Sequence, residues 1–277
     1  MATIAVEKIA GALGAEIAGV DLAGDLDDAT VAAIRRALLD HLVIFFRDQT
    51  LTPEGLAKFG RRFGTLARYP FVDGLAGHPE VIEVKKLEHE RLNFGGVWHT
   101  DTAYLDEPPM GSLLFAVEVP AAGGDTLFAN MHAAYEALSD GMKEFLAGLK
   151  AINSSAKADV SRTREDRIAS NPGKEKDKVF EAAHPVVRTH PETGRKALYV
   201  NVAHTARFDG MCEAESADIL DFLFAHQVKP EFTCRFRWRP GSLAFWDNRS
   251  TQHNPVNDYH GQRRIMHRIT LAGDRPR

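Results

Sequence analysis

The segment from Arg264 to Leu271 constrains the fold most, because it predicts a β-strand that is buried on both faces. Side chains alternate along a strand, so Arg264, Met266 and Arg268 share one face, and the opposite face is largely apolar. A buried arginine destabilises a protein unless it is paired with an anion. We therefore consider three interpretations: ion pairs with acidic side chains elsewhere, a solvated edge strand, or a strand that faces bound anions.

Short runs of strand-forming residues recur along the chain, and they do not alternate regularly with helices. Connections between them are long and irregular, which favours an antiparallel sandwich over a parallel sheet. The sequence thus predicts a mainly β protein with flanking helices. The expected strands cover 42–46, 113–119, 197–202, 232–238, 242–246 and 264–271, with short strands or a hairpin in 5–20; the expected helices start at Asp27 or Asp28 and at Thr52, and cover 131–149 and 213–226.

The segment Trp98-His99-Thr100-Asp101 contains a candidate metal-binding pair. On a strand, His99 and Asp101 point the same way and can reach one metal ion, whereas Thr100 turns away. His253, far downstream, can supply a second imidazole from another strand, and we expect that strand to pair with 264–271. Two histidines and one carboxylate suit Fe(II) and leave three coordination positions open. A His-x-Asp pair also occurs by chance, so this pattern alone does not establish a metal site.

Composition is compatible with one large domain that spans residues 1–277. The net charge of −4 gives no reason to expect nucleic acid as a partner. The two cysteines, Cys212 and Cys234, are too few for a disulfide framework, so we expect both to be reduced. Neither a signal peptide nor an apolar run of membrane-spanning length is evident, and we expect a cytoplasmic protein without a membrane partner.

The segment 153–178 is rich in Ser, Lys, Arg, Asp and Glu and has few large apolar residues. Such a segment buries little surface. One interpretation is a solvated surface insertion. The other, which we favour, is a mobile lid over an active site, in which Lys157, Arg162 and Arg164 help to hold an anionic substrate.

Several ordered motifs resemble the family of taurine dioxygenase and 2,4-dichlorophenoxyacetate dioxygenase, the TauD/TfdA family. The resemblance runs from about Ala5 to the C-terminus. It implies an oxidoreductase that is an Fe(II)- and 2-oxoglutarate-dependent dioxygenase, with a double-stranded β-helix core (jelly roll, cupin-like). The motifs are GGVWHTDTAY, GGDTLFANMHAAYEALS, HPVVRTHPETGRKALYVN, FRWRPGSLAFWDNRSTQH and QRRIMHRITL.

In this family, His99, Asp101 and His253 match the iron ligands. The resemblance implies Fe(II), 2-oxoglutarate and O2 as cofactor and cosubstrates, with succinate and CO2 released as a substrate C–H bond is hydroxylated. Halogenating relatives lack the carboxylate ligand. Because Asp101 is present, we expect hydroxylation.

The resemblance also assigns residues to the cosubstrate. Thr126 and Arg264 match the threonine and arginine that bind the distal carboxylate of 2-oxoglutarate. Arg268 matches an arginine near the metal-bound end of the cosubstrate, which in many members also contacts an anionic group of the substrate. A non-oxygenase metal-binding β-sandwich would not need these three residues, and is the less favoured alternative.

The candidate substrate-pocket residues are Tyr69, Gly95, Tyr104 and His204, together with Arg268. Taurine-specific members carry a histidine in place of Tyr69, an asparagine in place of Gly95 and an aromatic residue in place of His204. We therefore expect a small organic anion other than taurine, namely a sulfonate, an alkyl sulfate, or an aryloxy or other carboxylate. Taurine dioxygenase itself remains the alternative. The resemblance further implies a homo-oligomer, either a dimer or a tetramer.

Overall fold

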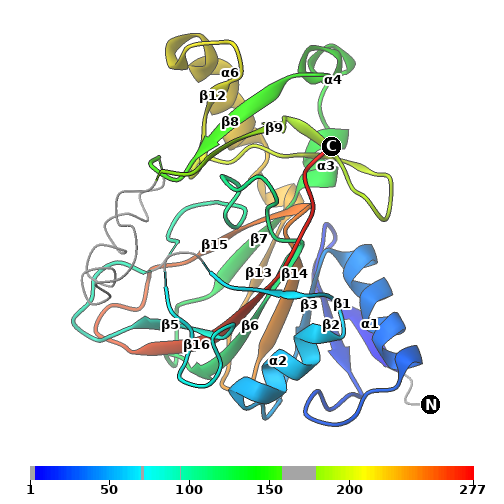
Figure 1. Ribbon diagram of the computed structural model, residues 1–277, viewed down its shortest axis with the longest axis vertical. Helices are drawn as coiled ribbons and strands as arrows, with labels where there is room; N and C mark the ends of the chain where they lie inside the picture. Colours follow the sequence, from blue (N-terminus) through cyan, green and yellow to red (C-terminus); the bar gives the residue numbers. More distant parts are fainter. Residues whose placement is uncertain (1–3, 70–71, 94, 158–178) are drawn as a thin grey trace.

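The computed structural model describes residues 4–69, 72–93, 95–157 and 179–277. A large sheet and a smaller sheet face each other, and helices cover the outer face of the large sheet (Figure 1). The predicted mainly β fold with flanking helices is confirmed, and the facing sheets form the expected jelly-roll core.

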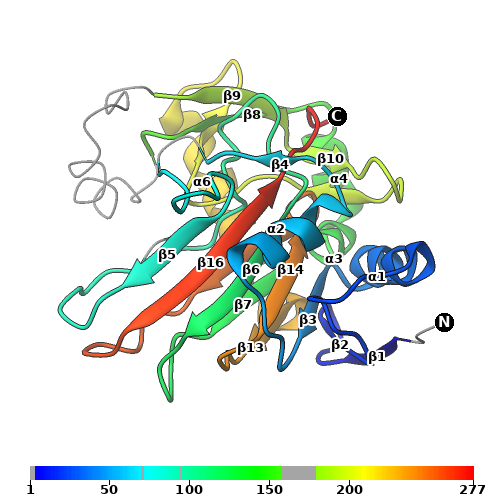
Figure 2. The same cartoon turned by 60° about the horizontal axis from the view of Figure 1, so that its bottom comes forward.

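The large sheet contains eight strands, most of them antiparallel to their neighbours. Its order is β1-β2-β3-β14-β6-β16-β4, with β5 also paired to β16, and only β2 and β3 run parallel. Figure 2 shows β5, β16, β6, β14 and β3 side by side. Their bounds are β1 (Ala5–Lys8), β2 (Ala15–Ala18), β3 (Val43–Phe46), β4 (Leu66–Ala67), β5 (Ile82–Lys86), β6 (Gly111–Glu118), β14 (Leu243–Asp247) and β16 (Arg264–Leu271).

The smaller sheet holds the strand that carries His253. Its order is β13 (Thr233–Phe236), β7 (Thr126–Asn130), β15 (Thr251–Pro255). The expectation that the His253 strand pairs with 264–271 is therefore wrong. Both edges of β16 are taken, by β6 on one side and by β4 and β5 on the other, so β16 reaches β15 only across the sandwich.

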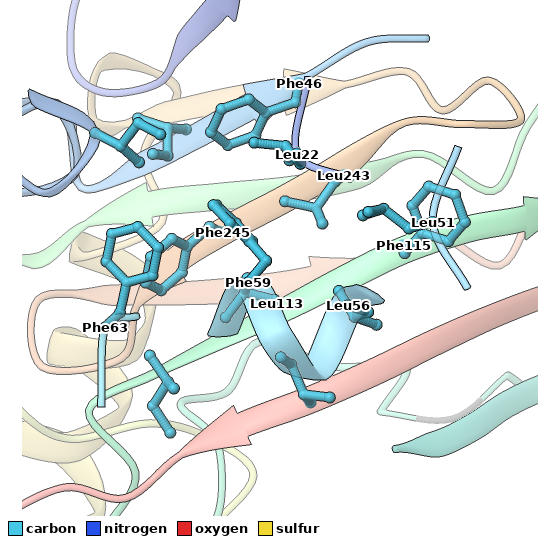
Figure 3. Packing of buried hydrophobic residues seen from close by; sticks show 14 of the residues in the cluster. Leu22, Phe46, Leu51, Leu56, Phe59, Phe63, Leu113, Phe115, Leu243 and Phe245 are labelled. Carbon is cyan, nitrogen blue, oxygen red and sulfur yellow. The ribbon is translucent and has the colours of Figure 1, made fainter. Parts of the chain in front are cut away.

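Alternation along the central strands explains the two apolar layers. In β14, Leu243 and Phe245 face the helices, whereas Ala244 and Trp246 face the smaller sheet. Figure 3 shows Phe245 and Leu243 in the first layer, where Phe59 packs above the sheet. β16 is buried on both faces in the same way, as predicted.

Two helices supply the outer side of the first layer. α1 (Asp28–His41) begins after Asp27, whose carboxylate accepts a hydrogen bond from the Thr30 amide at 2.7 Å. α2 (Pro53–Arg61) begins after Thr52, which caps the Gly55 amide, and Pro53 occupies the first turn. Both helix starts agree with the sequence prediction.

The remaining helices lie towards the other end of the molecule (Figure 1). The single helix predicted over 131–149 is wrong: α3 (Met131–Glu136) ends, and α4 (Asp140–Leu146) begins after Ser139, whose hydroxyl caps the Met142 amide. Ser139 restarts the helix because its side chain competes for backbone groups. α6 (Glu213–His226) has the predicted bounds.

These helices pack around short strands and a third apolar cluster. The segment predicted as a strand over 197–202 forms only β11, because the chain leaves the ladder after Leu198. The short elements are β8 (Lys150–Ser154), β9 (Glu181–Pro185), β10 (Val187–Thr189), β11 (Lys196–Leu198), β12 (Thr205–Phe208) and the 3₁₀ turn η1 (Pro230–Phe232).

The predicted lid falls only partly within the described residues. Asn153 and Ser154 end strand β8 and are buried, and Lys157 donates a hydrogen bond to the Thr205 carbonyl. Residues 158–178, with Arg162 and Arg164, lie outside the described residues, so the lid remains a prediction. Within the described ranges, no helix is both long and apolar enough to cross a membrane.

Candidate metal centre and adjoining cavity

His99 and His253 are brought together by their own backbones. The His99 amide donates to the His253 carbonyl at 3.0 Å, and the His253 amide donates to the His99 carbonyl at 2.9 Å. β15 carries His253, which lies opposite Phe128 of β7. The two imidazole centroids are consequently 4.1 Å apart.

Asp101 joins these histidines from a turn, so the prediction of a strand through His99 and Asp101 is wrong. Only His99 forms a bridge, and the chain turns at Asp101, with Thr102 at a φ of 42°. Thr100 does point away, as predicted, but for another reason. Its hydroxyl donates to the Thr251 carbonyl at 3.0 Å and replaces the ladder bond that a strand would have made.

The three side chains have the geometry of a metal site. Asp101 Oδ1 lies 3.7 Å from His99 Nε2 and 3.8 Å from His253 Nε2. One ligand atom from each residue lies within 4.8 Å of the others, and all three residues are buried. Burial lowers the pKa of His99 and brings that of His253 well below its ordinary value, so both imidazoles are neutral and can offer a lone pair.

A backbone carbonyl orients the first imidazole. His99 Nδ1 lies 2.7 Å from the Val97 carbonyl oxygen, so Nδ1–H donates and the lone pair stays on Nε2, towards Asp101. Gly95 packs against the same ring. A Cβ on Gly95 would lie 2.9 Å from His99 Cε1, and its φ of 73° also favours glycine, so the space beside Gly95 is filled by His99.

The second oxygen of Asp101 is held by two other side chains. Oδ2 accepts a hydrogen bond from the Ser112 hydroxyl at 2.8 Å and forms an ion pair with Arg268 Nη2 at 2.6 Å. Burial alone would raise the pKa of Asp101, but the charge of Arg268 and the hydrogen bond from Ser112 hold it below its usual range. Asp101 is therefore an ionised carboxylate whose Oδ1 remains for a metal ion.

Sequence reasoning missed Ser112 and its neighbour Asn248. The Ser112 hydroxyl donates to Asp101 and accepts from Asn248 Nδ2 at 3.2 Å and from Arg268 Nη2 at 3.1 Å, which uses its full hydrogen-bonding capacity. Its one sequence signal is a polar residue within the apolar run of β6.

A cavity extends from the histidines between the two sheets. Arg264 and Arg268 reach it from β16 of the large sheet, and Thr126 from β7 of the smaller one. Arg264 Nε and Nη2 and Arg268 Nε are buried without hydrogen-bond partners among the described residues. Unpaired guanidinium donors in a buried cavity fit an anionic ligand. The lining residues are Val84, His99, Leu114, Thr126, Phe128, Trp246, His253, Pro255, Arg264 and Arg268.

Thr126 is prepared to donate a hydrogen bond. Trp238 Nε1 donates to Thr126 Oγ1 at 3.0 Å, so the threonine oxygen accepts from the indole and its own hydrogen is left for another acceptor. Sequence reasoning missed Trp238, because its contact with Thr126 depends on the pairing of β13 with β7.

The substrate-pocket candidates fall into two places. His204 lies near the metal centre, with its ring centroid 6.3 Å from that of His99, and Tyr104 packs edge-on against it at 4.9 Å. Tyr69 instead lines another cavity, with Thr102 and Glu107. The structure thus groups Gly95, Tyr104 and His204 around His99 and leaves Tyr69 apart.

Comparisons with known proteins match this geometry. The family described as "Taurine catabolism dioxygenase TauD, TfdA family" matches residues 5–270. An alpha-ketoglutarate-dependent sulfate ester dioxygenase of Pseudomonas putida is 39% identical, over 98% of this chain and 90% of that protein. An alkylsulfatase of Acinetobacter baylyi is 37% identical, over 97% of this chain and 85% of that protein. The structure of AAD-2 in complex with Mn(II) and N-oxalylglycine has a TM-score of 0.82 and 30% identity, and covers 99% of each chain.

Proposed function

We propose a substrate class for this chain on the premise that it belongs to the TauD/TfdA family of dioxygenases. The chain is a 2-oxoglutarate-dependent dioxygenase, and its cofactor and cosubstrates are Fe(II), 2-oxoglutarate and O2. Its proposed substrate is a small alkyl sulfate ester. The observation that carries this choice is the name of its curated relatives, a sulfate ester dioxygenase and an alkylsulfatase.

We assign His99, Asp101 and His253 as the ligands of Fe(II). The donor set supports this assignment, because two neutral imidazoles and one carboxylate oxygen leave positions for the cosubstrates. When bound, iron supplies the O2 chemistry that couples decarboxylation of 2-oxoglutarate to C–H hydroxylation. The protein contributes geometry: Val97 fixes the His99 tautomer, and Ser112 and Arg268 fix the Asp101 carboxylate.

We assign Arg264 and Thr126 to the distal carboxylate of 2-oxoglutarate. Two observations support this. Arg264 has buried donors without hydrogen-bond partners among the described residues, and Thr126 keeps a hydroxyl hydrogen for another acceptor because its oxygen accepts from Trp238. An arginine and a hydroxyl together give a carboxylate charge-assisted hydrogen bonds in a site screened from water.

Arg268 is the proposed anchor for anionic groups beside the metal. Its Nη2 holds Asp101, while its buried Nε has no partner among the described residues. Tyr104 and His204 would form the substrate side of this site. Hydroxylation of the carbon that bears the sulfate ester yields an unstable product, whose C–O bond breaks to give an aldehyde and sulfate.

A taurine dioxygenase is the second candidate, and the family description favours it. Incubation with Fe(II), 2-oxoglutarate and one substrate at a time separates the two. We expect hexyl sulfate to yield succinate and sulfate in equal amounts. A higher kcat/KM for taurine, with sulfite released, would replace the proposal by the second candidate. Hexanesulfonate and an aryloxyacetate test the remaining anion classes.

Two further properties are part of this proposal. A homodimer or homotetramer follows from the family resemblance alone. A cytoplasmic location is compatible with the two cysteines, Cys212 and Cys234, which are unpaired.

A further inference from the structure

Lys86 is a buried lysine that forms no ion pair within the described part of the chain. It ends β5, is 3% exposed, and its Nζ has no hydrogen-bond partner among the described residues. Its ammonium lies 4.3 Å from the ring centroid of Tyr259, which is a cation–π contact. Such a contact offsets only part of the free energy of burying a charge. The position of Lys86 therefore calls for an anion that binds there.

The strand register places Lys86 beside the cavity. Lys86 lies directly opposite Arg264 across β5 and β16, which are adjacent in Figure 2, and directly opposed residues in antiparallel strands share a face. Val84, on the same face of β5, lines the cavity together with Arg264 and Arg268. Arg268 is four residues along β16, or roughly 13 Å at the rise of a strand. Lys86 is not itself among the residues that line the cavity, but the register places it next to Arg264, beside the end away from the metal ligands.

The cation at the neighbouring position is also unneutralised. Arg264 is 5% exposed, and no ion pair of it occurs within the described part of the chain. Burial lowers the pKa of Arg264, as expected for a cation that lacks an adjacent anion. Tyr259 and Asp125, in that order, are the acidic groups that raise the pKa of Arg264, and Asp125 Oδ2 already accepts a hydrogen bond from Arg235 at 2.6 Å. Two buried cations are therefore neighbours on the same face of β5 and β16, beside the end of the cavity that Arg264 lines.

We propose that Lys86 determines the specificity for the cosubstrate, because its Nζ joins Arg264 in binding the distal carboxylate of 2-oxoglutarate. Lys86 then selects 2-oxo acids that carry a second carboxylate over those that end in a methyl group. This role rests on the proposed assignment of Arg264 and Thr126 to that carboxylate. It also explains how a lysine is retained at a buried position of an edge strand.

The adjacent lysine provides a matched control. Lys85 lies on the opposite face of β5, is 38% exposed at its side chain, and pairs with Glu83 at 2.7 Å. Lys85→Met and Lys86→Met make the same chemical change one residue apart. Only the second change removes a charge from the cavity face.

Calorimetric binding to the full chain loaded with Mn(II) tests this role without turnover. The two ligands are 2-oxoglutarate and 2-oxopentanoate, which has the same carbon chain with a methyl group in place of the distal carboxylate. We expect Lys86→Met to weaken 2-oxoglutarate binding about tenfold or more and to change 2-oxopentanoate binding by less than about twofold. Lys85→Met should leave both affinities unchanged.

Other outcomes overturn the proposal in distinguishable ways. An equal loss for both ligands means that Lys86 only shapes the cavity, and unchanged binding of 2-oxoglutarate means that it has no role. A wild-type protein that does not distinguish the two ligands contradicts the assignment of Arg264 and Thr126 instead. If Lys86→Met does not fold, Lys86→Gln, which keeps a polar end group without the charge, is measured against the same criteria.

Discussion

Arg268 and Asp101 form a buried ion pair, with Nη2 2.6 Å from Oδ2. The pair occupies one carboxylate oxygen and leaves Oδ1 facing the two imidazoles. Asp101 is therefore restricted to binding a metal ion through a single oxygen. Arg268 links two proposed functions, because the side chain proposed to bind anions also holds a proposed metal ligand in place.

Replacement of Asp101 by alanine should abolish turnover. The variant loses a ligand and leaves Arg268 buried without its partner, so metal affinity should fall by more than the roughly 10- to 100-fold seen when an outer hydrogen bond is lost. Mn(II) titration and succinate formation measure the two effects. Asp106→Ala is the control, because it removes an exposed carboxylate that pairs with Arg275 at 3.2 Å. Wild-type hydroxylation by the Asp101 variant would contradict the assigned metal site.

Replacement of Arg264 by alanine should raise the KM for 2-oxoglutarate by about 10- to 100-fold, since it removes a charge-assisted interaction of about 1.5–3 kcal/mol. Steady-state kinetics at saturating substrate measure this change. Arg263 is a matched control. It is the neighbouring arginine, its side chain is about half exposed, and its Nε lies 3.5 Å from Glu118 Oε2. A change confined to the KM of the prime substrate would mean that the roles of Arg264 and Arg268 are exchanged.

Replacement of Ser112 by alanine should weaken metal binding about tenfold and leave the fold intact. The variant removes the hydrogen bond that Ser112 donates to Asp101 Oδ2, and it removes the oxygen that accepts a hydrogen bond from Asn248 Nδ2. Binding of Mn(II), followed by calorimetry, measures the loss. Ser250→Ala also removes a buried serine hydroxyl, which has no hydrogen-bond partner in the ranges that the structure describes, and should leave the affinity unchanged. Equal affinities for both variants would refute the positioning role of Ser112.

Stability should fall on acidification, in part because of His132. Burial lowers the pKa of His132 to about 4, from an ordinary value of 6.5. The unfolded chain then takes up a proton below pH 6.5 while the folded protein does not, so stability falls between pH 6.5 and about 4, by up to about 3 kcal/mol. Urea unfolding of the metal-free protein across this range, for wild type and His132→Asn, measures the effect. A variant with the same pH slope as wild type would exclude His132 as the cause.

The sequence predicted local features well where the signal is itself local. The bounds of β16 and α6 follow from alternation and helical periodicity within single segments. The sequence also predicted which residues come together at the candidate metal site, because a motif marks them and their side chains are a suitable set of metal-binding groups: His99, Asp101 and His253. The prediction that the strand continues through Asp101 was wrong, because the Thr100 hydroxyl donates a hydrogen bond to the Thr251 carbonyl of β15 and the strand pairing ends there.

Features that depend on register between distant strands were not predictable. Ser112 reaches Asp101 only because the order β14-β6-β16 places it beside Arg268 and Asn248. The position of Lys86 depends on its pairing with Arg264, which lies 178 residues downstream. A single amino-acid sequence indicates which segments form strands, but it does not show which distant strands pair with each other.

The reciprocal amide bonds between His99 and His253 have a consequence for protein engineering. Because these hydrogen bonds join main-chain atoms, an exchange of either side chain leaves the groups that pair the two positions in the chain. A cysteine or glutamate introduced at 253 would start from the same backbone position opposite residue 99, with its ligand atom at a different reach. The scaffold is thus suited to redesign for metals other than the one it evolved to hold.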